Sequence, residues 1–588
     1  MVRKGELSPQ DIFDYFYDSN AAMFEDPVIG AELYSSSDFG ASWSKTHDKA
    51  LKNVCYSYGY YFGVVTANPT DTNHLFIAGV PLLQSTDGGS TFHFAGGDNV
   101  HVDHHFIWVN PNNSLHLING NDGGINISYD GAKTWTKCNS PPVGQFYTVA
   151  VDNQKKYNVY GGLQDNGTWR GPNNYVYSTA WHQEGRYAYQ RIGGGDGMQV
   201  QIDPRDNSTY TGYQYGHYTY TDANGDKHKI HPKHSLKEPH LRWNWQSPIL
   251  LSPHNPDILY IGSNKLHRSK QKTANFKTIS KDLTQGAKEG DVSYGTLSCI
   301  DESPLVEGLI YTGSDDGLVQ YSPNGGKTWA TISTALPANL WVKEVIASEH
   351  AKNRVIVALN GHTWDHFDSY LYLSENNGKN WKPIGENLPD EPINTVIEDP
   401  NNEDVIYLGT DAGLYISTNR GSTFYPISSL PTVPVHDLAI QENNRDLLVA
   451  THGRSIYKMQ LEPVYQSISH RDSSFALLPL PSIKFNENWG KLNYRWMTRI
   501  PQIQAVFFTH QTDSVQIEIS DNTGATLLVT TLSPKKGYNN KNVALQFDQK
   551  QGDSTLSQER GKFYPSKGLY TLTIFQNGIR KKQTFIVK

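Results

Sequence analysis

The chain of 588 residues is longer than one ordinary hydrophobic core requires, so more than one domain is expected. Its net charge of −7 is spread without blocks of like charge, which excludes the basic surface typical of nucleic-acid binding. No apolar run approaches the ~18 residues of a membrane-spanning helix. The 35 Tyr, 13 Trp and 50 Gly, with only 5 Met and 3 Cys, are typical of an all-β protein rich in turns.

The N-terminal region is predicted to contain one short helix. Residues 1–6 lack the apolar stretch of a secretory signal peptide. A helix is predicted over residues 8–24, because Ser8 can cap it and Pro9 suits its first turn. Phe16 and Met23 would then lie roughly on one side of that helix.

A short pattern, Ser-x-Asp-x-Gly-x-Thr-Trp, recurs along the chain after this helix. Copies that follow one another directly lie about 43 to 52 residues apart. A fixed period in this range indicates stacked or radial copies of one supersecondary unit. The Asp position of the pattern, occupied by Asp or Asn, falls at Asp38, Asp87, Asp130, Asn324, Asn376 and Asn419.

Each copy of the pattern, called the Asp box below, is predicted to be a hairpin turn. The Asp or Asn can accept hydrogen bonds from backbone amides two residues on and so hold the turn. Gly tolerates positive φ where the chain reverses, and Thr and the aromatic residue start the next strand. The turn explains every residue type in the box, so we expect the box to be structural and not catalytic.

A second signature precedes several boxes by roughly thirty residues. It is a turn containing Pro, then a short apolar strand that ends in Gly, as from Pro69 to Gly79 and from Pro400 to Gly409. Units without a clear box still keep it. One unit therefore contains four short antiparallel strands in roughly forty to fifty residues, which is the pattern of a β-propeller blade.

The boxes and the segments between them resemble a known family. The boxes are similar to the Asp-box repeats of bacterial neuraminidases, and the whole series resembles the sortilin-like propeller proteins of bacteria that carry a glycosyl hydrolase label. The resemblance covers nearly the whole chain. It implies a propeller fold and an extracytoplasmic location, and it implies that the N-terminal helix is an insertion inside a blade. The most specific segments are 99–105, 121–124, 161–166, 193–197, 242–245 and 451–454.

The number of units predicts the domain organisation. Seven units start near residues 145, 193, 242, 294, 341, 393 and 435, and seven blades are a common closed propeller. The first hairpin, near residues 31–48, has no inner strands before it. We therefore expect a complete seven-bladed propeller preceded by the last blades of an incomplete one. One ten-bladed ring of the sortilin kind is the alternative, and a simple capping helix is the alternative for the N-terminus.

The C-terminal region changes pattern. Residues 466–500 are irregular and are expected to be a linker. Beyond them, alternating strands and an Asn577-Gly578 turn predict an immunoglobulin-like β-sandwich. The predicted parts are a helical insertion or capping segment (1–30), blades of an incomplete propeller (31–143), a seven-bladed propeller (144–465), a linker (466–500) and a sandwich (501–588).

A candidate metal site lies at residues 101–105. His101, Asp103 and His105 alternate at the start of a predicted strand, which would put all three on one face, with His104 on the other. Imidazole and carboxylate groups could hold a divalent metal there, although no fourth ligand is evident. Polar side chains lining the propeller channel, with His104 among the ligand-binding candidates, are the alternative.

Candidate catalytic carboxylates lie beside Gly-rich turns at Asp165 and Asp196. A glycosidase needs two carboxyl groups that face one bond. Asp122, Gln164 and Asn166 are neighbouring candidates for ligand binding. Capping of turns between blades is the alternative for these Asp residues.

Candidate ligand-binding aromatics and donors lie further along the chain. Tyr215 belongs to a Tyr-rich stretch whose rings could stack on a sugar, and Arg242 and Asn244 flank a Trp. His452 and Arg454 belong to the closing blade. Burial of alternate aromatics inside the blade is the alternative for this stretch.

Two functions are consistent with these residues. The first is an extracytoplasmic binding or scaffold propeller that recognises a glycan or an extended peptide, with no organic cofactor. The second is a glycoside hydrolase with a cleft between tandem propellers, which the family label implies; one carboxylate would come from each propeller. Much of the first propeller is absent from the chain, so that pair cannot be mapped. A partner protein or missing N-terminal blades could complete it.

Overall fold

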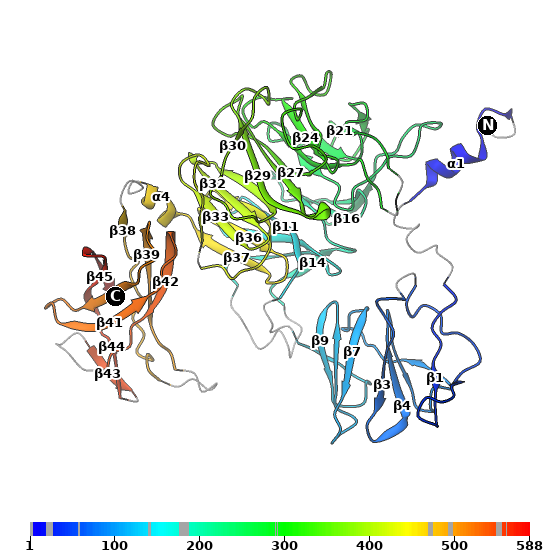
Figure 1. Ribbon diagram of the computed structural model, residues 1–588, viewed down its shortest axis with the longest axis horizontal. Coiled ribbons are helices and arrows are strands. Elements are labelled where there is room, and N and C mark those ends of the chain that lie inside the picture. The colour runs from blue at the N-terminus through cyan, green and yellow to red at the C-terminus, as the bar shows by residue number, and fades with distance from the viewer. Residues whose placement is uncertain are drawn as a thin grey trace. The chain divides into compact units, whose positions relative to one another are not determined.

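The computed structural model describes residues 4–18, 28–56, 59–138, 143–175, 187–288, 290, 292–427, 429–468, 474–491, 498–548, 555–559 and 561–588. Contacts between Cα atoms divide the chain into two units, Met1–Ser298 and Cys299–Lys588, which are described separately. Figure 1 shows that arrows far outnumber coiled ribbons in both. Within the described residues, no helix is long and apolar enough to cross a lipid bilayer.

The N-terminal helix α1 spans Pro9–Phe16. Ser8 caps it as predicted: the Ser8 hydroxyl oxygen accepts a hydrogen bond from the Asp11 amide, and the Asp11 carboxylate accepts one from the Ser8 amide. The helix ends eight residues before the predicted boundary, since Tyr17 already has an extended backbone with ψ 131°. Met23 and the rest of residues 19–27 lie outside the described part of the chain.

The first unit consists of antiparallel sheets built from consecutive strands. It opens on a two-stranded hairpin, the predicted hairpin without inner strands. Four-stranded sheets follow. The strands are β1 (Tyr34–Ser35), β2 (Ser44–Lys45); β3 (Val64–Asn68), β4 (Asp71–Ala78), β5 (Leu82–Ser85), β6 (His93–Phe94); β7 (His104–Val109), β8 (Leu117–Asn121), β9 (Gly124–Ser128), β10 (Thr136–Cys138); β11 (Phe146–Val151), β12 (Asn158–Leu163), β13 (Gly167–Pro172), β14 (Gln190–Gly193); β15 (Val200–Ile202), β16 (Thr209–Tyr213), β17 (His217–Thr221), β18 (Lys227–Ile230); and β19 (Ile249–Leu251), β20 (Leu259–Gly262), β21 (Leu266–Ser269), β22 (Lys277–Thr278).

The second unit opens within β23 and continues the same pattern. Its last sheet of this kind has three strands, in agreement with the missing box. A short 3-10 helix, η2 (His362–Trp364), lies between two strands. The strands are β23 (Leu297–Glu302), β24 (Ile310–Ser314), β25 (Val319–Ser322), β26 (Ala330–Thr331); β27 (Trp341–Ala347), β28 (Val355–Gly361), β29 (His366–Ser374), β30 (Lys382–Pro383); β31 (Ile393–Asp399), β32 (Asn402–Thr410), β33 (Gly413–Ser417), β34 (Tyr425–Pro426); and β35 (Val435–Gln441), β36 (Asp446–Thr451), β37 (Ile456–Gln460).

The hydrophobic cores lie between successive sheets. One cluster joins Tyr311 of β24 to Val345 and Val357 of the next sheet, and another joins Phe76 of β4 to Ile107 of β7. Burial between neighbouring sheets is what a radial stack of blades requires, because each sheet is covered on both faces. The protein is therefore an all-β protein of many four-stranded antiparallel sheets, consistent with propeller blades.

The Asp box forms the predicted hairpin turn between the third and fourth strands. In the box of β5 and β6, the Ser85 hydroxyl oxygen accepts a hydrogen bond from the Gly89 amide at 2.9 Å. The Asp87 carboxylate accepts the Thr91 amide at 2.9 Å and the Thr91 hydroxyl at 2.6 Å. Asp87 thus binds the amide four residues on, and not two, because the intervening Gly lets the turn close around the carboxylate.

The Gly that ends the second strand has a packing role. A Cβ placed on Gly409, near the end of β32, would lie 2.6 Å from the Val435 side chain, which starts the next sheet. Gly313 in β24 would meet Val342 of the next sheet in the same way. The recurring Gly therefore marks the place where the following sheet crosses closely.

The C-terminal residues form further sheets that share one hydrophobic core. Residues 475–477, predicted to belong to a linker, pair with the sheet as β38. Ile503, Ile517 and Leu572, from three strands in two sheets, lie in that core. The predicted Asn577-Gly578 turn joins the last two strands, and both residues have positive φ. The elements are α4 (Glu462–Ile468), β38 (Phe475–Leu477), β39 (Gln502–Thr509), β40 (Val515–Ser520), β41 (Thr526–Leu532), β42 (Gly537–Ala544), β43 (Thr555–Glu559), β44 (Lys562–Pro565), β45 (Gly568–Gln576) and β46 (Ile579–Val587).

Candidate functional site

The predicted site residues gather at one end of their sheets. In an antiparallel sheet of consecutive strands, the start of the first strand and the hairpin between the second and third strands lie at the same end. Asp122, Asp165 and Tyr215 occupy such hairpins in three successive sheets, and Asp196 lies four residues before the start of β15. This end of the sheets is called the hairpin rim below.

A recurring β-bulge places one polar residue at the hairpin rim. The register of the first strand shifts by one residue in five sheets. Bulges aim a side chain away from the regular alternation and are common beside functional sites. The extra residues are His105, Tyr147, Lys343, Asn394 and His436.

The rim of the first unit holds a cluster of carboxylates. The Asp196 side chain accepts a hydrogen bond from the Asp165 amide at 2.5 Å and another from the Gln214 side chain at 2.5 Å. Asp196 is buried, and both of its oxygens are occupied by these donors. The predicted alternative of turn capping therefore describes the Asp196 contacts well.

Asp165 differs from Asp196 in its electrostatics. Burial, together with the nearby charges of Asp196, Asp122 and Asp103, raises the pKa of the Asp165 carboxyl to about 7. Its backbone lies in the left-handed region with φ 60°, which Asp tolerates better than most residues. A carboxyl that is protonated near neutral pH beside a held carboxylate is an acid–base pair in chemical terms.

The predicted metal triad is not assembled. The strand β7 begins at His104, and Asp103 has φ 63°, so the expected alternation over residues 101–105 does not occur. His101 Nε2 lies 2.9 Å from the Asp165 carbonyl oxygen, and His105 Nε2 lies 2.6 Å from an Asp122 carboxylate oxygen. Within the described ranges, no group of three or more His, Cys, Asp or Glu side chains could hold a metal ion. Both imidazoles instead connect one sheet to groups at the rim.

Of the remaining candidates in this cluster, His104 and Asn166 are structural in their contacts. His104 is buried, and its Nδ1 lies 2.9 Å from Asn119 Oδ1. The Asn166 side chain donates to the carbonyl oxygens of Asp122 and Gln164. The Asn166 side chain thus joins Asp122 to Gln164 through main-chain carbonyl contacts beside Asp165.

Arg242 and Asn244 are already engaged within the first unit. Arg242 donates to Asp282 at 2.7 Å, and the Asn244 side chain donates to the Thr296 hydroxyl at 2.8 Å. These contacts fix the connection before β19, and neither residue lines the pocket described below. Their predicted ligand contacts gain no support from this geometry.

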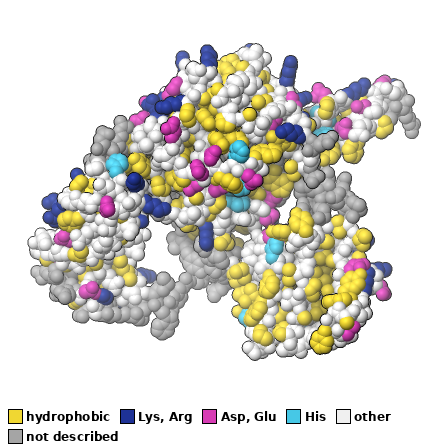
Figure 2. Space-filling model, in the orientation of Figure 1, with side chains coloured by type: hydrophobic (Ala, Val, Ile, Leu, Met, Phe, Trp, Pro, Cys, Tyr) yellow, Lys and Arg dark blue, Asp and Glu magenta, His cyan; other side chains and the backbone are white. Residues whose placement is uncertain are grey.

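The second unit has its own polar rim. His452, in the hairpin between β36 and β37, stacks on the bulged His436 at 4.4 Å, while Arg454 is exposed nearby. Figure 2 shows Asp, Glu and His side chains gathered in the region of β27 and β36. Burial, with the charge of Lys343 and the neighbouring His452, lowers the pKa of His436 to about 2. Burial therefore keeps the His436 imidazole neutral at the rim of the second unit.

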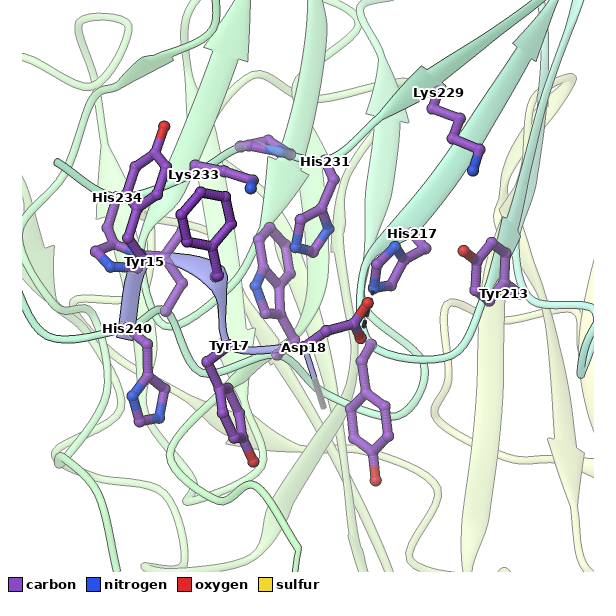
Figure 3. Close-up of a pocket in the computed structure, with 15 residues that line it drawn as sticks. Tyr15, Tyr17, Asp18, Tyr213, His217, Lys229, His231, Lys233, His234 and His240 are labelled. Carbon is purple, nitrogen blue, oxygen red and sulfur yellow. Dashed lines mark ion pairs between the residues drawn. The ribbon is translucent and has the colours of Figure 1, made fainter. Parts of the chain in front are cut away.

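A pocket of about 280 Å³ lies in the first unit beside the sheet of β15 to β18 (Figure 3). The strands β16, β17 and β18, the hairpin between the first two and the connection that follows β18 supply most of its wall, and residues 15–18 at the end of α1 supply the rest. Its volume is close to the lower limit of ~300 Å³ for small-molecule sites. It is lined by Tyr15, Phe16, Tyr17, Asp18, Tyr213, Tyr215, His217, Lys229, His231, Pro232, Lys233, His234, His240, Leu241 and Trp243.

A stack of aromatic rings forms one wall of this pocket. The ring of His217 stacks on Tyr213 at 5.0 Å and on His231 at 4.2 Å, and His231 lies 5.0 Å from Trp243. Burial lowers the pKa of His217, and burial with the nearby His217 lowers the pKa of His231 to about 4. At neutral pH these imidazoles are uncharged, so the wall is an aromatic platform.

Tyr215, a predicted ligand-binding aromatic residue, belongs to the wall of this pocket. Its φ of 58° is unusual for a bulky residue. The ring packs edge-on against Trp245 at 5.4 Å. Such backbone strain is concentrated at turns and functional sites, so this hairpin is a candidate part of a functional site.

The pocket's other polar residues were missed from the sequence. Lys229, Lys233, His234 and His240 lie in or after β18, in a stretch dense in His and Lys. That composition was the available signal. Lys229 and Lys233 give the wall a positive charge, and the described lining of this wall contains no Asp or Glu apart from Asp18.

Comparisons with known proteins give a fold-level likeness only. No protein-family model matches the chain, and no curated protein matches it. The extracellular domain of the hybrid two component system BT3049 from B. thetaiotaomicron aligns with 90% of this chain and 68% of its own, at 13% identity and a TM-score of 0.41. The extracellular domain of the one component system BT4673 from the same species aligns with 95% and 71%, at 12% identity and a TM-score of 0.38.

The β-propeller domain of Cps50 (Swd1) from Myceliophteria thermophila aligns with 54% of this chain and 97% of its own, at 10% identity and a TM-score of 0.38. Identities this low bear on the fold alone. Function therefore has to be argued from the chain's own residues.

Proposed function

We propose that the protein is an extracytoplasmic β-propeller protein that binds a glycan or an extended peptide at the aromatic–histidine pocket beside β15 to β18. The proposed architecture is a seven-bladed propeller over residues 144–465, preceded by blades of an incomplete one and followed by an immunoglobulin-like sandwich. The sortilin-like resemblance in the sequence supports the location. The pocket itself is the observation that carries the function.

Three properties of the pocket support ligand binding. Its stacked rings offer flat apolar faces, on which sugar rings or aromatic side chains pack. Lys229 and Lys233 add charges that can orient an anionic group. The strained backbone of Tyr215 lies in the hairpin between β16 and β17, which lines the pocket.

The test is binding of the full chain to glycan and peptide arrays. Binding is expected to fall strongly for Lys233→Ala and for His217→Ala, which remove a charge and a ring from the wall. Lys227→Ala is the matched control, because Lys227 is exposed at the start of β18 and does not line the pocket. No binding on either array, or binding by all three variants equal to that of the wild type, would rule out this pocket as the ligand site.

A glycoside hydrolase is the second candidate function, and the Asp165–Asp196 pair favours it. The Asp165 carboxyl has a pKa near neutrality beside Asp196, the arrangement expected of a general acid next to a carboxylate. The test is release of reducing sugars from polysaccharides by the full chain and by Asp165→Asn. Activity that is lost in Asp165→Asn supports this function, and activity that survives removes Asp165 from the mechanism.

A further inference from the structure

The end of α1 and the two residues that follow it contact the pocket of their own chain. Tyr17 lies 4.9 Å from the ring of His240, and Tyr15 lies 5.7 Å from His234. An Asp18 carboxylate oxygen lies 3.4 Å from His217 Nε2 (Figure 3). A segment of four residues, Tyr-Phe-Tyr-Asp at positions 15–18, thus contacts the wall built by residues 213–243.

The segment complements the wall in charge as well as in shape. The Lys233 ammonium group lies 5.0 Å from the centre of the Tyr15 ring and 5.3 Å from that of Phe16. Cations over aromatic faces attract, more so where water is partly excluded. Asp18 is the one acidic side chain in the described lining, opposite a wall that carries Lys229 and Lys233. The wall therefore suits aromatic side chains followed by a carboxylate.

The segment leaves the helix in an extended form. The helix α1 ends at Phe16, and Tyr17 has φ −56° and ψ 131°, the conformation of an extended peptide. Side chains of an extended segment alternate, so Tyr17 and Asp18 can contact different parts of the wall. Tyr15 and Phe16, by contrast, contact the wall from the last turn of α1.

The docking of the segment is shallow. No residue of α1 is buried, Phe16 is 70% exposed, and Tyr17 is 41% exposed. A helix of eight residues has little stability of its own. The contacts are ring packing, one cation over two rings and one partly exposed contact between the Asp18 carboxylate and the His217 imidazole, which are weak interactions singly. A competing ligand could therefore displace the segment without disturbing a sheet.

We propose that the pocket recognises a peptide in which aromatic residues precede a carboxylate, and that residues 15–18 are a tethered copy of this ligand that an external peptide displaces. The inference rests on the proposed function of the pocket as a ligand site. It names the ligand class of that site as peptide and adds an occupant supplied in cis.

The experiment uses a labelled synthetic peptide with the sequence of residues 11–18 and the full chain. Fluorescence polarisation gives the affinity for the wild type and for a tether variant carrying Tyr15→Ser, Tyr17→Ser and Asp18→Ser. The tether variant is expected to bind at least about tenfold more tightly, because a segment that occupies nine-tenths of the pockets lowers apparent affinity about tenfold. Adding Lys233→Ala to the tether variant should remove this binding, whereas adding Lys227→Ala should not.

Each other result overturns the inference in an identifiable way. Equal affinity for wild type and tether variant would contradict the tethered ligand. Absence of peptide binding, with a glycan bound at the Lys233-dependent pocket, would contradict the peptide while leaving the proposed function in place. Absence of any Lys233-dependent ligand would overturn both. A wild-type dimer in sedimentation that the tether variant does not form would show that the segment docks on a second copy and contradict docking in cis.

Discussion

The Asp boxes of the first unit and the Asn boxes of the second form the same turn with opposite hydrogen bonds. In the first unit, the Thr91 hydroxyl donates to the Asp87 carboxylate at 2.6 Å. In the second, the Asn419 side-chain amide donates to the Thr423 hydroxyl at 2.8 Å. Both side chains accept the backbone amide four residues on, at 2.9 Å.

The comparison of Asp with Asn shows which hydrogen bonds the turn requires. The turn needs an acceptor for the amide four residues on, and where that residue is Thr its hydroxyl can serve as donor or acceptor. A negative charge is not needed. The charge has one consequence: hydrogen bonds from Thr91 and Ser85 lower the pKa of Asp87 to about 2, so only the first unit's boxes respond to strong acid.

Acid should act first on buried histidines, and this is the largest expected effect. Burial, with the charge of Lys265 and the neighbouring His231, lowers the pKa of His267 to about 3, so the folded chain holds this imidazole neutral. Its contribution to stability is full above pH 6.5 and is lost as pH falls toward 3, by about 1.4 kcal/mol per pH unit. Unfolding by denaturant at pH 8, 6 and 5 should show this loss.

The matched variant is His267→Gln. Its stability at pH 8 is expected to fall, because His267 lies 2.8 Å from the Ser263 hydroxyl and 3.1 Å from the Thr278 hydroxyl. Its stability should then change less between pH 8 and pH 5 than that of the wild type. An identical pH dependence in both proteins would contradict the buried neutral imidazole.

The Ser of the box should matter equally in both units. Ser85 and Ser417 are fully buried, and each hydroxyl oxygen accepts the amide of the Gly four residues on at 2.9 Å. Ser85→Ala or Ser417→Ala leaves that amide without a partner, at a cost of about 1–3 kcal/mol at any pH. Denaturant unfolding measures it.

The exposed Ser of each box is the control. Ser90→Ala and Ser422→Ala should change stability by less than about 0.5 kcal/mol. A Ser85→Ala effect that differs strongly from that of Ser417→Ala would mean that the two boxes are not equivalent turns.

The carboxylates at the rim should give opposite results on conversion to amides. Asp196→Asn places an amide group against the donors of Asp165 and Gln214, which should destabilise the protein by about 1–3 kcal/mol. Asp165→Asn should stabilise it at pH 8, because a raised pKa means that stability falls as pH rises from about 4 to 7. At pH 4 the gain should vanish. A loss of stability on Asp165→Asn at pH 8 would contradict the raised pKa.

The repeat could be predicted from the sequence because its causes are local. Each box closes through hydrogen bonds within five residues, and the Asn577-Gly578 turn needs only its own two φ angles. The recurring Gly at the end of the second strand could be recognised from its position in the repeat. The reason for it, close contact with the next sheet, becomes clear only from the structure.

The site was harder to predict because it depends on long-range contacts. A one-residue bulge at His105 removed the alternation on which the metal triad depended. The pocket joins Tyr17 to His240, which are about 220 residues apart, so no periodicity marks it. Tyr215 was singled out because aromatic residues cluster locally, whereas the His-rich and Lys-rich stretch around His231 was not connected with a site.

Exchanging Asp and Asn between the boxes is the smallest and most specific test of the comparison. Asp38→Asn, Asp87→Asn and Asp130→Asn together should barely change stability at pH 7, since Asn forms the same turn in the second unit. Below pH 3.8 the wild type should lose stability that the triple variant keeps, because the pKa of each Asp is held at about 2 only while the chain is folded. Asn419→Asp should introduce this acid sensitivity into the second unit. Thermal unfolding at pH 7 and pH 3 separates the outcomes, and a triple variant as acid-sensitive as the wild type would show that the charge of the box has no part in stability.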